Sequence, residues 1–307
     1  MKDSLFESTN KLSDVKNIDG LIAFLKGRKH DFYHHFTTFS TLEKIISYKT
    51  WRFAPGEIKN DLHEYDEKNN MIIRKMVLST SFSYGDEDNM AMWAMYCIPR
   101  NEAIRLTMTR DAVERLVQCA RNDKECSQEV DNVCLHDVVY YQGYKDDDKD
   151  SNNMLICDHD FSKDIDKSIY KEINRPNIIT GYIKNSAWKH EQESRITLFL
   201  KKKHKGDIFV SIKDDIDYIL KNSAITFGPW TSDGLLLDRY NKVRKLLDNC
   251  NVNVEMNYLS KLKIDQKLFG NGLLISLSPF ANKVNLRNPC PYENDKNASV
   301  TVMYQID

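Results

Sequence analysis

The sequence predicts an α+β fold in which mixed, mainly antiparallel small sheets are flanked by helices. Short runs that alternate apolar and polar residues, as strands do, are interleaved with apolar residues at helical spacing. The two kinds of segment follow one another without a strict βαβ period. With 307 residues, of which 41% are apolar and 29% charged, the chain has the composition of a globular protein with one large domain or two small ones.

The first half of the chain carries alternating strand and helix signals. The pattern Ser40-Thr41-Leu42-Glu43 is a capping box, so a short helix is predicted from there to about Lys49. Apolar spacing predicts further helices from about residue 88 and from 111 to 120. Strands are predicted at 32–36, 75–83, 104–108 and 133–141, and the acidic stretch 145–153 is predicted to be a solvated loop.

In the second half of the chain, several residues mark where predicted helices and strands begin or end. Pro176 ends one predicted helix, Ser232 opens another, and Gly228-Pro229 stops a buried type of strand. The lysine-rich segment 201–205 is predicted to be a turn. Helices are predicted at 162–173 and 232–247, and strands at 191–200, 208–212, 224–227, 252–256, 273–277 and 299–306.

Charge and motif content exclude several classes of protein. The 44 basic and 45 acidic side chains give a net charge of −1, which argues against a protein whose main role is to coat nucleic acid or an anionic membrane. There is no apolar run of about 18 residues and no secretory signal, so a cytoplasmic protein with no membrane partner is predicted. The seven cysteines lack C-x-x-C spacing and HExxH is absent, so no metal site is predicted on those grounds.

The strongest candidate site is the segment Trp188-Lys189-His190-Glu191-Gln192-Glu193-Ser194-Arg195. If it is a strand, residues two apart share a face, so Glu191, Glu193 and Arg195 form one stripe. Two like charges raise at least one carboxyl pKa and an arginine opposes that, so protonation there is tunable. The alternative is a solvated strand edge with an exposed ion pair.

Three weaker candidates precede it. His35 and Thr37 share a strand face and are suited to a ribose or phosphate, although a histidine there is also typical of a core. The alternate hydroxyls of Ser79-Thr80-Ser81-Phe82-Ser83 face one way, as at many strand ends. Oxygen atoms of Asn60, Asp61 and Glu64 are able to bind a divalent cation, or Asn-Asp is a helix N-cap.

In combination, these motifs resemble the DUF2971 family of bacterial and phage-associated proteins. The resemblance covers roughly residues 30–260, leaving 1–29 as an N-terminal segment and 261–307 as a C-terminal extension. Phe36 stands where the family usually has tyrosine, and Leu62 where it has proline. The segments that carry the resemblance are Tyr33-His34-His35-Phe36-Thr37, Asn60-Asp61-Leu62-His63-Glu64, Ser81-Phe82-Ser83, Met92-Trp93-Ala94-Met95-Tyr96, the Trp188 to Arg195 segment and Phe227-Gly228-Pro229.

The motif order of this family is similar to that of ADP-ribosyltransferases, which implies small sheets around a cleft and NAD as the cofactor. By that resemblance Glu193 is catalytic, stabilising positive charge as nicotinamide leaves, while Glu191 orients the acceptor. His35 contacts a ribose with help from Thr37, and is counted with the catalytic residues. The remaining cofactor-binding candidates are Ser81 and Ser83 beside the nicotinamide, Arg195 on pyrophosphate or on Glu193, and Tyr96, which with Trp93 also fits a core role.

Three functions remain open from the sequence. The first is an NAD-dependent ADP-ribosyltransferase-like enzyme, a toxin or phage-defence effector that modifies protein or nucleic acid. The second is a non-catalytic sensor or adaptor that binds a nucleotide signal. The third is a nuclease that binds Mg²⁺ through Asp61, Glu64 and Glu193.

Overall fold

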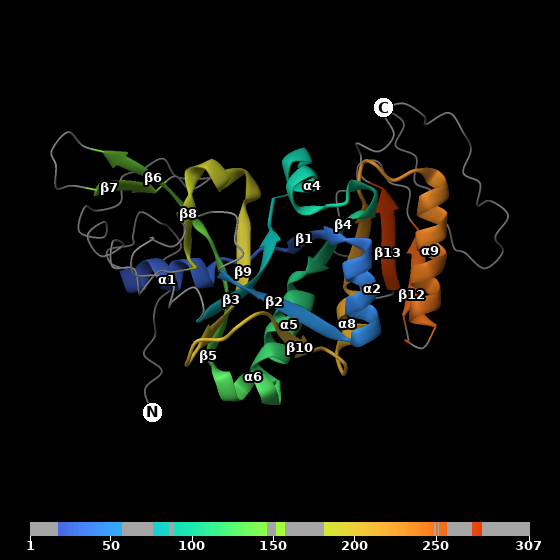
Figure 1. Ribbon diagram of the computed structural model, residues 1–307, viewed down its shortest axis with the longest axis horizontal. Coiled ribbons are helices and arrows are strands. Elements are labelled where there is room, and N and C mark those ends of the chain that lie inside the picture. The colour runs from blue at the N-terminus through green and yellow to red at the C-terminus, as the bar shows by residue number, and fades with distance from the viewer. Residues whose placement is uncertain are drawn as a thin grey trace. The chain divides into compact units, whose positions relative to one another are not determined.

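A computed structural model describes residues 18–56, 76–85, 89–145, 152–156, 181–248, 250, 252–256 and 272–277. In them the protein is a mixed α+β structure with mainly antiparallel strands and flanking helices, as predicted (Figure 1). Two compact units divide the chain, each built from segments distant in sequence. The first unit comprises Met1–Lys29, Arg52–Ser83 and Ala120–Val210, and the second comprises His30–Trp51, Tyr84–Cys119 and Ser211–Asp307.

The first unit is organised around the strand β9, Glu193–Leu200, which pairs antiparallel with β3 on one side and β5 on the other. β2 pairs with β3 and β10 with β2, while β6 pairs with β7 and β8 in a separate small sheet. The other elements are α1 Ile18–Gly27, β2 Thr50–Pro55, β3 Val77–Ser83, α6 Lys124–Glu129, β5 Val130–Asp137, β6 Val139–Lys145, β7 Asn152–Ile156, β8 Ile183–Asn185, the 3-10 helix η4 Ser186–Glu191 and β10 Ile208–Ser211.

The second unit has a sheet in the order β1-β4-β11-β13-β12, antiparallel up to β11 and parallel from β11 to β12. Helix α9 lies alongside β12 at one edge of this sheet (Figure 1). The elements are β1 Phe32–Thr38, α2 Phe39–Tyr48, α4 Met90–Tyr96, η3 Arg100–Glu102, β4 Ala103–Thr109, α5 Arg110–Asn122, α8 Ile216–Lys221, β11 Ser223–Phe227, α9 Asp233–Leu247, β12 Asn253–Met256 and β13 Gly272–Leu277.

Local apolar patterns account for most of these elements. Helix α2 buries Leu42, Ile45 and Ile46, the face that the sequence predicts. Every residue of β4 is buried, as expected of a central strand. Ser232 caps α9 through a hydrogen bond that its hydroxyl accepts from the Leu235 amide at 3.4 Å.

Several predicted boundaries are wrong. The N-cap of α2 is Thr38 and not Ser40, because the Thr38 hydroxyl accepts from the Thr41 amide at 3.3 Å. The strand predicted at 133–141 is two strands, since the chain leaves one sheet after Asp137 and enters another at Val139. The solvated loop is shorter than predicted, because Lys145 pairs with Asn152 across β6 and β7.

Other predictions concern residues that the structure does not describe. These are the helix at 162–173, the middle of the acidic loop, the strand at 299–306, and the oxygen cluster of Asn60, Asp61 and Glu64. The boundaries at 29, 260 and 261 and the cleft stay predictions. Within the described ranges, no helix combines the length and hydrophobicity needed to cross a membrane.

Candidate functional site

One face of the first unit's sheet carries a row of polar side chains. In the pairing of β3 with β9, Ser83 lies opposite Glu193 and Ser81 opposite Arg195. On the other side of β9, His136 of β5 lies opposite Arg195. Paired residues and their i+2 neighbours share a face, so Glu193 and Arg195 lie side by side and the hydroxyls of β3 face them, as predicted.

Glu191 is not on that strand, which corrects the prediction of a three-residue stripe. It is the last residue of η4, and Gln192, which follows it, has a left-handed φ of 45°. The Gln192 amide turns back to donate to the carbonyl of Lys189 at 3.3 Å. This turn breaks the i, i+2 relation, so Glu191 approaches Glu193 from the chain that precedes the strand.

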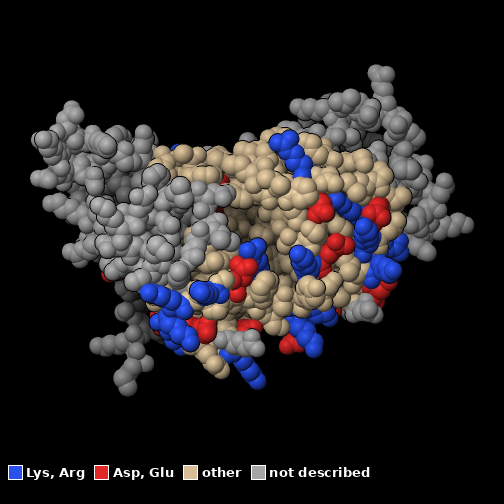
Figure 2. Space-filling view, viewed as in Figure 1, with Lys and Arg blue, Asp and Glu red and all other residues tan. Residues whose placement is uncertain are grey.

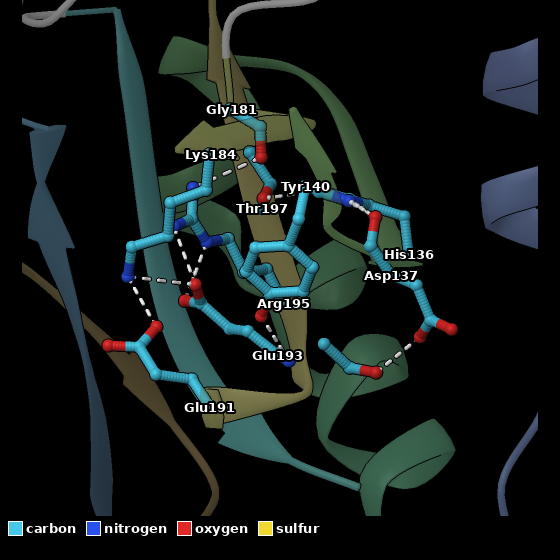
Figure 3. Close-up of polar contacts among 10 residues, drawn as sticks. His136, Asp137, Tyr140, Gly181, Lys184, Glu191, Glu193, Arg195 and Thr197 are labelled. Carbon is cyan, nitrogen blue, oxygen red and sulfur yellow. Dashed lines mark hydrogen bonds and ion pairs between the residues drawn. The ribbon is translucent and has the colours of Figure 1, made fainter. Parts of the chain in front are cut away.

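The two carboxylates meet through a lysine from β8, as Figure 3 shows. The Nζ atom of Lys184 contacts Oε2 of Glu191 in a short hydrogen bond and lies 3.3 Å from Oε2 of Glu193. Arg195 binds Glu193 with both arms of its guanidinium, Nε to Oε1 at 2.7 Å and Nη2 to Oε2 at 2.8 Å. Its third nitrogen, Nη1, donates to the carbonyl of Gly181 at 3.1 Å.

This group of four charges, two of each sign, is buried. Its members, Lys184, Glu191, Glu193 and Arg195, have exposed fractions of 5%, 2%, 4% and 1%. Burial by itself lowers the pKa of Lys184, but the charges of Glu193 and Glu191 outweigh it and the pKa of the lysine is raised. The alternative of a solvated strand edge is therefore wrong, because both carboxylates lie inside the protein.

A neutral histidine lies next to this group. Burial lowers the pKa of His136 to about 4. Its Nδ1 lies 3.0 Å from the carbonyl of Asp137, which only accepts, so Nδ1 carries the proton. Nε2 is then the acceptor for the hydroxyl of Thr197 at 2.8 Å. Asp137 in turn accepts from Ser194 and pairs with Arg28 at 2.9 Å.

Backbone contacts hold the start of β9 in place. The amide of Glu193 donates to the hydroxyl of Tyr140 at 2.8 Å, and the carbonyl of Glu193 accepts from the amide of Val138 at 2.9 Å. Gly181, whose carbonyl binds Arg195, has a φ of 91°, a value that favours glycine. The position of the Glu193 side chain is therefore fixed from both its backbone and its carboxylate.

His35, Thr37 and Tyr96 belong to the second unit. His35 is half-buried, with its ring 5.3 Å from that of Trp51, and Thr37 lies on the same face of β1. Tyr96 packs on a cluster that contains Phe36, which points to the opposite face of β1. Tyr96 is half-buried and packs against this buried cluster, and not on the face of β1 that carries His35 and Thr37.

The histidine next to His35 has a structural role. His34 is buried, and its Nδ1 lies 2.9 Å from the hydroxyl of Thr107. Burial, with help from the charge of Arg105, lowers its pKa well below the usual value. A histidine with a structural role in the core, the alternative considered for this strand, is therefore found at His34.

Lys184, His136 and Thr197 were not among the candidates from the sequence. Lys184 lies on a three-residue strand, too short to show a period. Thr197 lies between apolar neighbours on β9, whereas His136 lies between Leu135 and Asp137 on β5. The signal that could have found them is the pairing of these two predicted strands, which sets their polar residues on one face. Among the described residues, no group of three or more histidine, cysteine or acidic side chains is arranged to hold a metal ion.

On the face drawn in Figure 2, basic and acidic side chains of the described residues are intermixed, in keeping with the balanced composition. No protein-family model matches the chain, and no curated protein matches its sequence.

Two similar solved structures are those of DarT from Thermus sp. 2.9, one in complex with NAD+ and one in complex with ADP-ribosylated ssDNA. Each is 7% identical to this chain, and each alignment covers 83% of this chain and 99% of the other. The TM-scores are 0.34 and 0.33. Likeness at this level carries no argument, so the proposals below depend on the chain's own residues.

Proposed function

We propose that the chain is an NAD-dependent ADP-ribosyltransferase-like enzyme whose chemistry is centred on Glu193. The observation that carries the proposal is the pairing of β3 with β9, which sets Ser83 opposite Glu193 and Ser81 opposite Arg195. A carboxylate flanked by hydroxyls and a guanidinium offers the groups that a nicotinamide riboside requires. The hydroxyls would bind neutral oxygens and amides, the carboxylate would face the ribose, and the guanidinium would hold that carboxylate in place.

The reaction would proceed by loss of nicotinamide with the electron pair of its glycosidic bond. The ribose carbon then carries partial positive charge, which an ionised Glu193 stabilises. Arg195 orients the Glu193 carboxylate through two parallel hydrogen bonds. Glu191 would accept the proton of the acceptor nucleophile, which is a group on protein or nucleic acid.

One observation favours the sensor as a second candidate. Both oxygens of Glu193 already accept hydrogen bonds from Arg195, and one also contacts Lys184. A carboxylate engaged in this way holds a pocket together without taking part in chemistry. A sensor would use the same groups to bind a nucleotide and would leave its glycosidic bond intact.

The test is nicotinamide release from NAD by the purified protein and its variants, with and without cell lysate as a source of acceptor. We expect Glu193→Gln to abolish release, because the amide cannot stabilise the positive ribose. Glu191→Gln should still release nicotinamide in water but should transfer no ADP-ribose to the lysate. Binding of NAD without release by the unaltered protein would establish the sensor instead.

A matched control separates chemistry from folding. Glu129→Gln makes the same change on an acid of the first unit that pairs with His204 at 2.8 Å, away from the proposed site. It should release nicotinamide at the rate of the unaltered protein. Circular dichroism and urea unfolding show whether Glu193→Gln is folded, and folded Glu193→Gln that still releases nicotinamide contradicts the proposal.

A further inference from the structure

Lys184 places its ammonium group in a cage of two carboxylates and one indole ring. Besides its contacts to Glu191 and Glu193, Nζ lies 4.9 Å from the centre of the Trp188 ring. Figure 3 shows the lysine side chain directed at both carboxylates. An aromatic face combined with negative charge is the set of groups by which proteins bind organic cations. The ammonium of Lys184 therefore occupies a position that has the groups needed to bind an organic cation.

Of the two cations in the group, only Lys184 is held in a way that permits exchange. Arg195 is fixed in a planar fork by Glu193 and by the carbonyl of Gly181. Lys184 is a point charge at the end of a flexible four-carbon stem, and rotation about its side-chain bonds moves the charge without moving β8. The departure of Lys184 would leave the bidentate pair of Arg195 and Glu193 intact.

The charges specify what would replace it. Among the described residues of this buried group, Lys184 and Arg195 contact Glu191 and Glu193, two charges of each sign. Moving the ammonium away takes one positive charge from beside two buried carboxylates, which is costly inside a protein. A ligand with one positive charge restores the balance, and a neutral ligand of the same shape does not.

We infer that Trp188, Glu191 and Glu193 form a binding site for a flat organic cation of the pyridinium class, and that Lys184 is an internal occupant that this ligand displaces. The contact of Lys184 with both acids is then autoinhibitory, because it covers the carboxylates until the cation arrives. Only the identification of the cation as the nicotinamide ring of NAD rests on the proposed function. The cation site itself does not depend on any turnover.

The test compares N-methylnicotinamidium, a pyridinium cation, with neutral nicotinamide as ligands for the full chain. Lys184→Gln removes the internal charge and keeps a donor for Glu191. Measured by calorimetry, this variant should bind the cation at least about tenfold more tightly than the unaltered protein does, since the competing occupant is gone. Nicotinamide should show no such gain. Trp188→Leu added to Lys184→Gln should lose most of it.

Two further measurements keep the inference open to refutation. Lys202→Gln, which removes an exposed lysine of the same unit, should bind as the unaltered protein does. In the unaltered protein itself, the cation should raise the melting temperature more than nicotinamide does, and Trp188→Leu should abolish the difference. Equal responses to the two ligands overturn the inference, whether or not Lys184→Gln folds. Cation binding without NAD cleavage would support the site and contradict only the proposed enzyme.

Discussion

The buried pair of Glu193 and Arg195 should show strong coupling in a double-mutant cycle. We consider Glu193→Met, Arg195→Met and the double variant, which keep side-chain volume while removing charge. Either single change leaves three of the four charges of this group, so that two charges of one sign face one of the other. The double change leaves Lys184 and Glu191 as a balanced pair.

The magnitude follows from this charge count. Breaking a buried pair by removing one partner costs about 3–5 kcal/mol, whereas replacing both with apolar groups is often close to neutral. The double variant should therefore be no less stable than the worse single variant, giving a coupling energy of about 3 kcal/mol or more. Urea unfolding at neutral pH measures all four free energies of unfolding.

The exposed pair of Arg52 and Asp207 is the matched control. It is also bidentate, at 2.8 and 3.1 Å, but its side chains are 52% and 26% exposed. The corresponding cycle there should give a coupling below about 1 kcal/mol. Additive effects of Glu193→Met and Arg195→Met, or equal coupling in the two pairs, would refute the view that burial makes the Glu193 network interdependent.

Two other predictions concern stability. Because burial lowers the pKa of His136 from 6.5 to about 4, the stability linked to its neutral form is present above pH 6.5 and is lost as the pH falls towards 4. The loss attributable to this group is about 3 kcal/mol. The difference in free energy of unfolding between the unaltered protein and His136→Asn, measured in urea, should therefore shrink by about that amount from pH 7 to pH 4. A difference that stays constant over this pH range would contradict the prediction. Gly228→Ala should lower stability by about 1–3 kcal/mol, since its Cβ would lie 2.5 Å from Cβ of Ala103 and 3.2 Å from the Trp93 ring. Gly234→Ala, in open space on α9, should be neutral or stabilising, and thermal unfolding that ranks the two glycines in the opposite order would refute this packing argument.

Many elements with their own apolar period could be predicted from the sequence, although α1, with buried Leu21, Phe24 and Leu25 at helical spacing, was missed. The strands β3 and β4 and the helix α9 carry complete local patterns and lie where they are predicted. Short elements such as β2, α6 and α8 were missed, because in a few residues no period can be counted. The break at Val138 was missed for another reason, since residues with high strand propensity continue on both sides of it while the chain changes sheets.

The candidate site divides in the same way. Glu193, Arg195 and the hydroxyls of β3 could be placed on one face because strand geometry alone determines which residues face together. Lys184 could not be found, because its burial depends on two acids that return seven and nine residues later in the chain. A lone lysine in a short polar segment is usually an exposed one.

The turn at Gln192 explains why the strand position predicted for Glu191 is wrong, and it also bears on the mechanism. Had Glu191 continued β9, its carboxylate would project from the same face as that of Glu193, two residues along the strand. The left-handed turn at Gln192 instead lets Glu191 approach from the side, so that one ammonium contacts both acids. A site that holds one positive charge between two carboxylates therefore depends on a backbone turn that the spacing of the acids does not reveal. The same turn makes Lys184 able to cover both acids at once, which is why displacement of a single side chain would open the site.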